Sequence, residues 1–99
     1  MQIGKTIKNL RQKKGLKQIE FAKKCNLSQS YLSLIEKEKK EPTLSMLKQI
    51  AAVLEIPVPV LVFFSLNEDD IPQSKKEAFK TLDPLIKGMM TNIFMPEPV

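Results

Sequence analysis

The sequence lacks several residue types on which enzymes and metal sites depend. It has no histidine and no tryptophan, and its one cysteine, Cys25, cannot form an internal disulfide or a multi-thiolate zinc site. Histidine is the commonest general base and metal ligand, so its absence removes most of the support for hydrolase and metalloenzyme interpretations. No paired carboxylates, no thiol with a base and no phosphate-cradling glycine loop compensate for it. The sequence therefore predicts a protein that is not an enzyme and that uses no cofactor or metal.

Long apolar segments are also missing. The longest apolar stretch, residues 58–64, contains Pro59 and is far shorter than the roughly 20 residues that span a bilayer. No apolar leader opens the chain, and an unpaired cysteine fits a reducing compartment. We therefore expect a cytoplasmic protein that is neither exported nor inserted into a membrane.

Charge divides the chain into two unequal parts. Residues 1–65 hold 12 Lys or Arg and 5 Asp or Glu, a net charge of +7, whereas residues 66–99 hold 4 and 6, a net charge of −2. A basic excess favours a polyanionic partner such as nucleic acid, although it often serves only to keep a small domain soluble. Ninety-nine residues suffice for one core and an appendage. We expect a basic domain over residues 1–65 and a C-terminal extension over residues 66–99.

Helical periodicity predicts five short helices in the basic domain. Apolar residues recur at helical spacing in five segments, residues 3–14, 18–25, 28–36, 44–54 and 58–64. Ser28 and Thr43 are well placed as N-caps, and Gly15 and Asn26 tolerate the backbone conformation that ends a helix in a tight turn. The predicted fold class is all-α, a five-helix bundle followed by a C-terminal helical extension.

The extension contains its own helix signals. Residues 67–71 are typical of an acidic loop, Ser74 and Glu77 have capping-box spacing, and Asp83 with Pro84 predicts a cap and a first-turn proline before a last helix. The apolar residues of that helix cover more than one neighbour can bury: Leu82, Leu85, Ile86, Met89, Met90, Ile93 and Phe94. We expect this face to contact a second subunit; the alternative is that it folds back over the fifth helix of its own chain.

A combination of residues in the second and third helices resembles a known family. A glutamine opens the second helix, a small alanine lies in its middle, a turn residue follows four positions later, and an Ile-Glu pair ends the third helix: Gln18, Ala22, Asn26, Ile35 and Glu36. Over about residues 3–65 the chain resembles the phage repressor and Cro-type (Cro/C1-type) helix-turn-helix, also called the xenobiotic-response-element (XRE) family. The resemblance implies a repressor-like DNA-binding bundle in a bacterial or phage-encoded regulator of transcription that is associated with the nucleoid.

The resemblance also implies which residues contact DNA. Gln18, beside Lys17 at the start of the second helix, would bond to a phosphate, and Gln29 would pair with N6 and N7 of an adenine. Leu34 has no donor or acceptor, so it could recognise only a thymine methyl group, unless it is tucked against the bundle. The complete predicted contact set is Lys17, Gln18, Ser28, Gln29, Ser30, Ser33, Leu34, Lys37, Lys39 and Lys40.

Other positions follow or depart from the family pattern. Arg11 and Glu36 occupy positions that the family pairs, which implies an ion pair that clamps the first helix to the end of the third. Asn26 and Glu38 stand where glycines are usual, and Glu38 would bring negative charge near the phosphates unless it points away or pairs with a lysine. Ile19, at a position that is usually charged, is a further candidate contact for the dimer.

Three functions are compatible with the sequence. The favoured one is a sequence-specific regulator, most simply a repressor, that reads the major groove of double-stranded DNA as a homodimer. The second is an antitoxin-type regulator whose C-terminal segment binds a protein partner. The third is a bridging module that keeps the fold but contacts other proteins, and it predicts no salt-sensitive binding to duplex DNA.

Overall fold

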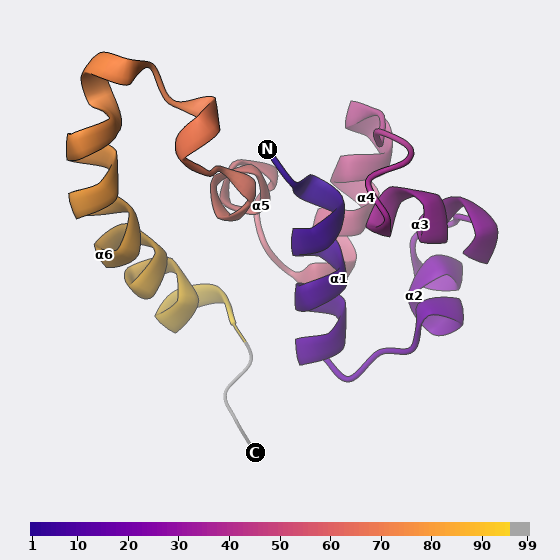
Figure 1. Ribbon diagram of the computed structural model, residues 1–99. Helices are drawn as coiled ribbons and strands as arrows, with labels where there is room; N and C mark the ends of the chain where they lie inside the picture. Colours follow the sequence, from indigo (N-terminus) through magenta and orange to yellow (C-terminus); the bar gives the residue numbers. More distant parts are fainter. Residues whose placement is uncertain (96–99) are drawn as a thin grey trace.

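The computed structural model describes residues 1–95 and confirms the predicted all-α fold (Figure 1). Within these residues there are six α-helices, two single-turn 3-10 helices and no strand. Each of the five predicted short helices is present, with both ends within one residue of the expected position. They are α1 Ile3–Lys13, α2 Gln18–Lys24, α3 Gln29–Glu36, α4 Leu44–Leu54 and α5 Val58–Ser65.

The five short helices enclose one apolar core to which every one of them contributes. α1 is central, since it packs against α3, α4 and α5. Full burial of one such apolar side chain contributes ~1.5–3 kcal/mol, so the core is the main source of the bundle's stability. Its buried members are Ile3, Ile7, Leu10, Phe21, Ala22, Cys25, Leu32, Ile35, Ile50, Ala51, Leu54, Ile56 and Leu61.

The crossing of α1 and α3 depends on a glycine. A Cβ atom added to Gly4 would overlap the backbone carbonyl oxygen of Ile35. The backbone of α1 therefore meets the end of α3 with no side chain between them, which only glycine permits. This close approach fixes the position of α3 relative to the core.

Two predicted N-caps begin helices in the bundle. The Ser28 hydroxyl oxygen accepts a hydrogen bond from the Tyr31 amide at 3.1 Å, and the Thr43 hydroxyl oxygen accepts one from the Met46 amide at 3.2 Å. Each cap satisfies an amide that has no partner within its own helix. These local bonds set where α3 and α4 start.

Left-handed residues follow four of the helices. Asn26, Glu38 and Glu55 have φ values of 58°, 62° and 61° and follow α2, α3 and α4, while Gly15 adopts φ 73° after α1. This conformation costs a residue with a Cβ atom roughly 1–2 kcal/mol, and asparagine tolerates it better than glutamate does. Each helix end is therefore sharp, which allows short connections between the helices.

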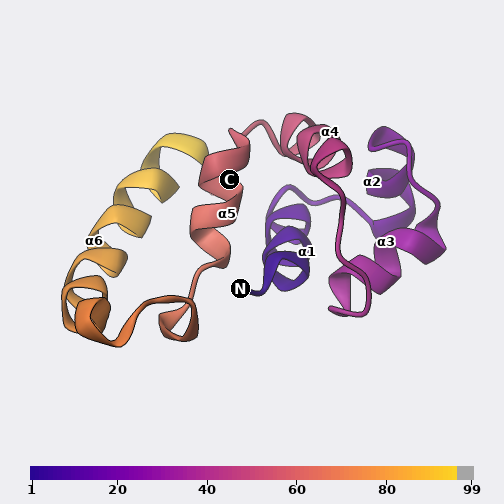
Figure 2. The same cartoon turned by 90° about the horizontal axis from the view of Figure 1, so that it is seen from above.

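In the described part of the extension, two 3-10 helices lead into one long helix that stands at one end of the molecule. After α5 the chain forms η1 Glu68–Asp70 and η2 Gln73–Lys75, and α6 then runs over Lys76–Phe94. Figure 2 shows α5 between α6 and α1, with α2 and α3 at the opposite end. The extension and the helix pair α2–α3 are thus separated by the body of the bundle.

The predicted start of the last helix at Asp83 and Pro84 is wrong. Pro84 lies inside α6, which begins seven residues before Asp83 and has no side-chain cap. The Asp83 carboxylate bonds to no backbone amide of the helix and instead pairs with Lys87, one turn later, at 3.2 Å. Since proline lacks an N–H, the carbonyl of Lys80 loses its usual helix partner, but the helix continues through this position.

No single helix in the described part of the chain is long and apolar enough to cross a membrane. α4 and α5 satisfy the length and composition requirement only when taken together, and they are bent by 97° at the break between them.

Candidate nucleic-acid interface

A tight turn joins α2 to α3 and sets the angle between them. The Leu27 amide donates to the Ala22 carbonyl at 2.9 Å, and the left-handed Asn26 reverses the chain. Ala22 is buried where the two helices meet, so its small side chain allows a close contact. The turn leaves Gln29 and Ser30 exposed at the start of α3. A helix presented in this way fits the major groove of DNA, which is about 12 Å wide.

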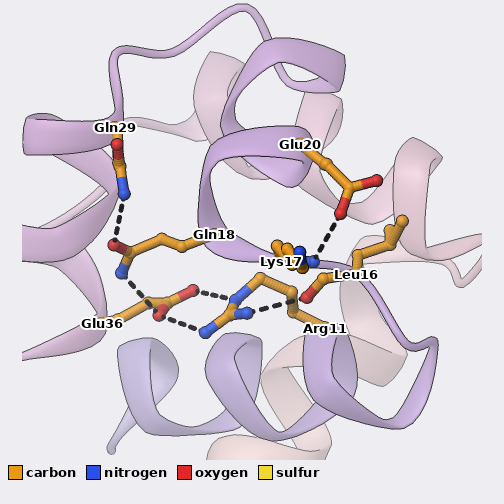
Figure 3. Close-up of polar contacts among 7 residues, drawn as sticks. All are labelled: Arg11, Leu16, Lys17, Gln18, Glu20, Gln29 and Glu36. Carbon is orange, nitrogen blue, oxygen red and sulfur yellow. Dashed lines mark hydrogen bonds and ion pairs between the residues drawn. The ribbon is translucent and has the colours of Figure 1, made fainter.

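A chain of polar side chains connects α1, α2 and α3 (Figure 3). Arg11 donates from Nε to Glu36 Oε2 at 2.8 Å and from Nη2 to Glu36 Oε1 at 3.0 Å. Its Nη1 donates to the Leu16 carbonyl at 2.8 Å. Glu36 Oε1 also accepts from Gln18 Nε2 at 3.1 Å, and Gln18 Oε1 accepts from Gln29 Nε2 at 3.4 Å. The structure thus joins Arg11 to Glu36 and extends the pair to the exposed end of α3.

The first link of this chain is buried. The side chains of Arg11 and Glu36 are 8% and 2% exposed, and their contact is bidentate. Such a contact is strong away from water, and the loss of either partner would leave the other charge uncompensated. The pair therefore fixes the position of the Glu36 carboxylate beside Gln18.

The Glu36 carboxylate determines how both glutamine amides are oriented. A carboxylate only accepts hydrogen bonds, so Gln18 must present its NH₂ group to Glu36 and its oxygen to Gln29. Gln29 then uses one N–H on Gln18 and keeps a second N–H and its carbonyl oxygen free. In a bidentate pair with adenine, such an N–H donates to N7 and such a carbonyl oxygen accepts from the N6 amino group. One N–H of Gln18 also stays free.

The other predicted residues on α3 lie on the same surface or close to it. Ser30 is exposed, Ser33 is half-buried, and Ser28 uses its hydroxyl oxygen for the cap while its O–H remains free. Leu34 is 39% exposed, so part of its side chain is accessible at this surface. The surface of α3 therefore combines hydroxyl groups with one apolar side chain.

Four of the predicted lysines are exposed around this surface. Lys17 precedes α2, and Lys37, Lys39 and Lys40 follow α3. The ammonium group of Lys40 lies 5.7 Å from the centre of the Tyr31 ring, which holds that part of the loop against α3. Tyr31 is a residue that sequence reasoning missed. No local signal indicates this role, because the partner of Tyr31 is Lys40, in the loop between α3 and α4.

Glu38 points away from this surface. Its carboxylate accepts a hydrogen bond from the Lys5 amide at 2.7 Å, at the N-terminal turn of α1. α1 has no side-chain cap of its own, so Glu38 supplies one from another part of the chain. Negative charge is favourable at the N-terminus of a helix. The repulsion of phosphates that the sequence suggested is therefore reduced by this orientation.

The predicted contact residues of α6 fall into two groups. Four are exposed, namely Leu82, Leu85, Met89 and Ile93, and three are half-buried, namely Ile86, Met90 and Phe94. Phe94 packs against the core of the bundle. Ile19, on α2, is 47% exposed. The structure thus leaves one edge of α6 without a neighbour and turns the adjacent edge inward.

Two comparisons of this sequence, with protein-family profiles and with known proteins, give matches. A profile of the helix-turn-helix family matches residues 7–61. The immunity repressor protein of Bacillus phage phi105 is 35% identical over 95 residues, which cover 84% of this chain and 66% of the phage protein. The HTH-type transcriptional regulator SinR of Bacillus licheniformis is 32% identical over 91 residues, which cover 91% of this chain and 78% of that protein.

A third similar protein is SinR of Bacillus subtilis, which is 38% identical over 61 residues. That match covers 61% of this chain and 55% of the relative. The chain thus spans just under two thirds of the phage protein and about half of this one. No solved structure gives a significant match.

Proposed function

The chain belongs to the helix-turn-helix family of DNA-binding transcriptional regulators, and we propose that it represses transcription by reading a DNA sequence in the major groove with α3. The predicted class, a regulator and not an enzyme, agrees with this family. The observation that carries the proposal is the polar chain from Arg11 to Gln29. It supports an adenine-reading amide at the exposed start of α3.

Each side chain of the interface has a role that its surroundings support. Gln29 pairs with adenine, Gln18 donates its free N–H to a phosphate, and Leu34 contacts a thymine methyl group. The positive end of α2 assists Gln18. The hydroxyl groups donate to bases or phosphates, and the lysines neutralise phosphates: Ser28, Ser30, Ser33, Lys17, Lys37, Lys39 and Lys40.

The protein acts as a homodimer in the cytoplasm, on the nucleoid. One helix-turn-helix reads only a few base pairs, and two copies gain affinity by contacting half-sites about 34–36 Å apart. The exposed residues of α6 supply the surface for this association, with the half-buried Ile86, Met90 and Phe94 beside them. Ile19 is a second candidate contact, because it is exposed on α2.

The test begins with selection of bound sequences from a random duplex pool. Fluorescence anisotropy then measures binding to the selected duplex and to a scrambled one across a salt series. Gln29→Ala should weaken binding to the selected duplex about 5- to 150-fold, or ~1–3 kcal/mol, and relax the preference at one adenine. Gln49→Ala is the matched control, since Gln49 is exposed on α4, outside the predicted contact set, and should leave binding unchanged.

Two results would contradict this function. Equal, weak binding of the parent to both duplexes would mean that α3 reads no sequence, and absence of salt-dependent binding would favour the bridging module. An unchanged base preference in Gln29→Ala, with normal folding, would remove the role assigned to the amide.

A second candidate function is that of an antitoxin-type regulator. The exposed apolar edge of α6 supports it, because such an edge can bind a protein partner. In that case α6 binds a different protein, and the chain alone stays monomeric. Native mass spectrometry of the purified chain separates the two: a dimer mass supports the regulator acting alone, and a monomer that still binds DNA supports the antitoxin type.

A further inference from the structure

Glu38 has an unfavourable backbone conformation just after α3. Its φ of 62° lies in the left-handed region, which is costly for a residue with a Cβ atom. Its amide donates to the Ile35 carbonyl at 3.0 Å, and the Lys39 amide donates to the Leu34 carbonyl at 2.9 Å. These two bonds form a Schellman motif, which glycine fits best because it has no Cβ atom. The turn itself therefore does not explain a glutamate at this position.

The contact of the Glu38 side chain does explain it. Glu38 Oε1 accepts a hydrogen bond from the Lys5 amide at 2.7 Å. This amide is in the first turn of α1, where an N-cap side chain usually accepts, but Gln2 makes no such bond and the turn holds no acidic residue. Gly4 leaves room for the carboxylate, since a Cβ atom there would lie 3.0 Å from Glu38 Oε1. The bond joins the end of α3 to the start of α1, which a glycine could not do.

The loop after α3 is held at two points. We call residues 37–41 the lysine loop. Glu38 attaches it to α1, and the Lys40 ammonium group lies 5.7 Å from the centre of the Tyr31 ring on α3. The two other lysines of the loop are exposed and flank Glu38 directly in the sequence. A loop that is already held loses less conformational freedom when its lysines bind phosphates. The position of these ammonium groups relative to α3 therefore depends on the Glu38 bond.

The charge of Glu38 alone has the opposite effect on DNA binding. A carboxylate in the lysine loop repels phosphates, so its removal should strengthen binding if charge were all that mattered. Glu55 offers a comparison, because it is also left-handed, with a φ of 61°. Its carboxylate pairs with Lys14 at 3.0 Å and is 80% exposed, whereas that of Glu38 holds a helix amide. The two glutamates share a backbone conformation and differ in what their carboxylates hold.

We propose that Glu38 is a positioning residue for DNA binding and that its bond to α1 holds the lysine loop where its ammonium groups meet phosphates. Glu38 itself does not contact DNA and acts through the adjacent Lys37 and Lys39. Phosphate contacts carry no sequence information, so the contribution is the same for every duplex. The proposal rests on the proposed function, in which these lysines neutralise phosphates, and adds what holds them in place.

Two amide variants of the full chain test this role. Glu38→Gln and Glu38→Asn both remove the charge, but only the longer glutamine keeps an acceptor within reach of the Lys5 amide. Asparagine tolerates the left-handed conformation well, so the turn itself is not weakened. Fluorescence anisotropy measures binding to the selected and the scrambled duplex across a salt series.

The two variants should differ in affinity. Glu38→Gln should bind both duplexes as tightly as the parent or more tightly. Glu38→Asn should bind both about three- to tenfold more weakly than Glu38→Gln, with an unchanged base preference. Its slope of log affinity against log salt should be smaller by about 0.9, the value for one phosphate contact.

Glu55→Asn is the matched control, because it makes the same change in the same backbone conformation outside the lysine loop. It should leave the affinity within about twofold of the parent. Thermal melting followed by circular dichroism gives the stability of each variant, and binding is measured well below every melting temperature. A loss of folding is thus separated from a loss of binding.

The possible failures are distinguishable. If the parent binds DNA and Glu38→Asn binds as tightly as Glu38→Gln, the bond to α1 does not position the loop, while the proposed function stands. Equal weakening in both variants would mean that the carboxylate charge matters and the hydrogen bond does not, which also contradicts the proposal. If the parent shows no salt-dependent binding to any duplex, the proposed function and the role of Glu38 are both wrong.

Discussion

Replacement of Arg11 by methionine tests the buried ion pair directly. The change keeps most of the side-chain volume but leaves the Glu36 carboxylate, which is 2% exposed, with only Gln18 as a side-chain donor. It also removes the donor to the Leu16 carbonyl. Breaking a buried pair by removal of one partner costs ~3–5 kcal/mol. A protein of this size has a total stability of about 5–15 kcal/mol, so a fifth of it or more should be lost.

Urea denaturation followed by circular dichroism measures this loss. With a slope of about 1–3 kcal/mol per molar urea, a loss of ~3 kcal/mol lowers the midpoint by about 1–3 M. The double variant Arg11→Met with Glu36→Leu removes both charges and should recover most of the stability, because no charge remains buried without a partner. It should still bind DNA weakly, since Gln18 has lost the carboxylate that orients it.

Two results would refute this reasoning. A single variant within about 1 kcal/mol of the parent would mean that the carboxylate is not destabilised by the loss of its partner. A double variant as unstable as the single one would mean that packing, and not the unpaired charge, accounts for the loss.

Three further predictions concern single positions in the bundle. Gly4→Ala should cost about 1–3 kcal/mol or more, because its Cβ atom would overlap the Ile35 carbonyl; an unchanged melting temperature would contradict this. Glu55→Gly should stabilise the protein by roughly 0.5–1 kcal/mol, because glycine adopts the left-handed conformation without the strain of a Cβ atom. The change loses only the ion pair with Lys14, which is weak because the Glu55 side chain is 80% exposed. A lower melting temperature would count against this. Burial raises the pKa of the Cys25 thiol to about 11, so a thiol reagent at about pH 8 should label it only after unfolding. The contribution of the buried thiol to stability is fully present below its ordinary pKa of 9.0 and should be lost as the pH rises toward 11. Fast labelling of the folded protein would contradict this.

The bundle could be predicted because the ends of its helices carry local chemical signals. Ser28 and Thr43 cap the helices that they precede, and Asn26 adopts the left-handed conformation that the turn requires. Each of these depends on residues at most four positions away, which a sequence displays directly. The periodicity of the core residues then placed each helix within one residue of its observed ends.

The parts that could not be predicted depend on contacts between distant residues. Glu38 bonds to an amide 33 positions away, so its sequence neighbours gave no indication of its direction. The resemblance implied the pairing of Arg11 with Glu36, but not the further bonds through Gln18, which depend on how the three helices pack. Proline is locally favoured at a helix start, but the helix-forming residues before Pro84 begin α6 earlier, and the local preference alone does not show this.

The hydrogen bond between Glu38 and Lys5 gives the molecule a built-in spectroscopic reporter. A carboxylate that accepts from a backbone amide at 2.7 Å deshields the amide proton, so the Lys5 resonance should stand downfield of the others in α1. Glu38 belongs to the loop that also holds Lys37 and Lys39, the residues proposed to meet phosphates. Movement of this loop on DNA would stretch the bond and shift that one resonance. The chemical shift of the Lys5 amide would therefore report DNA binding from the opposite side of the loop, with no label on α3 or on the duplex.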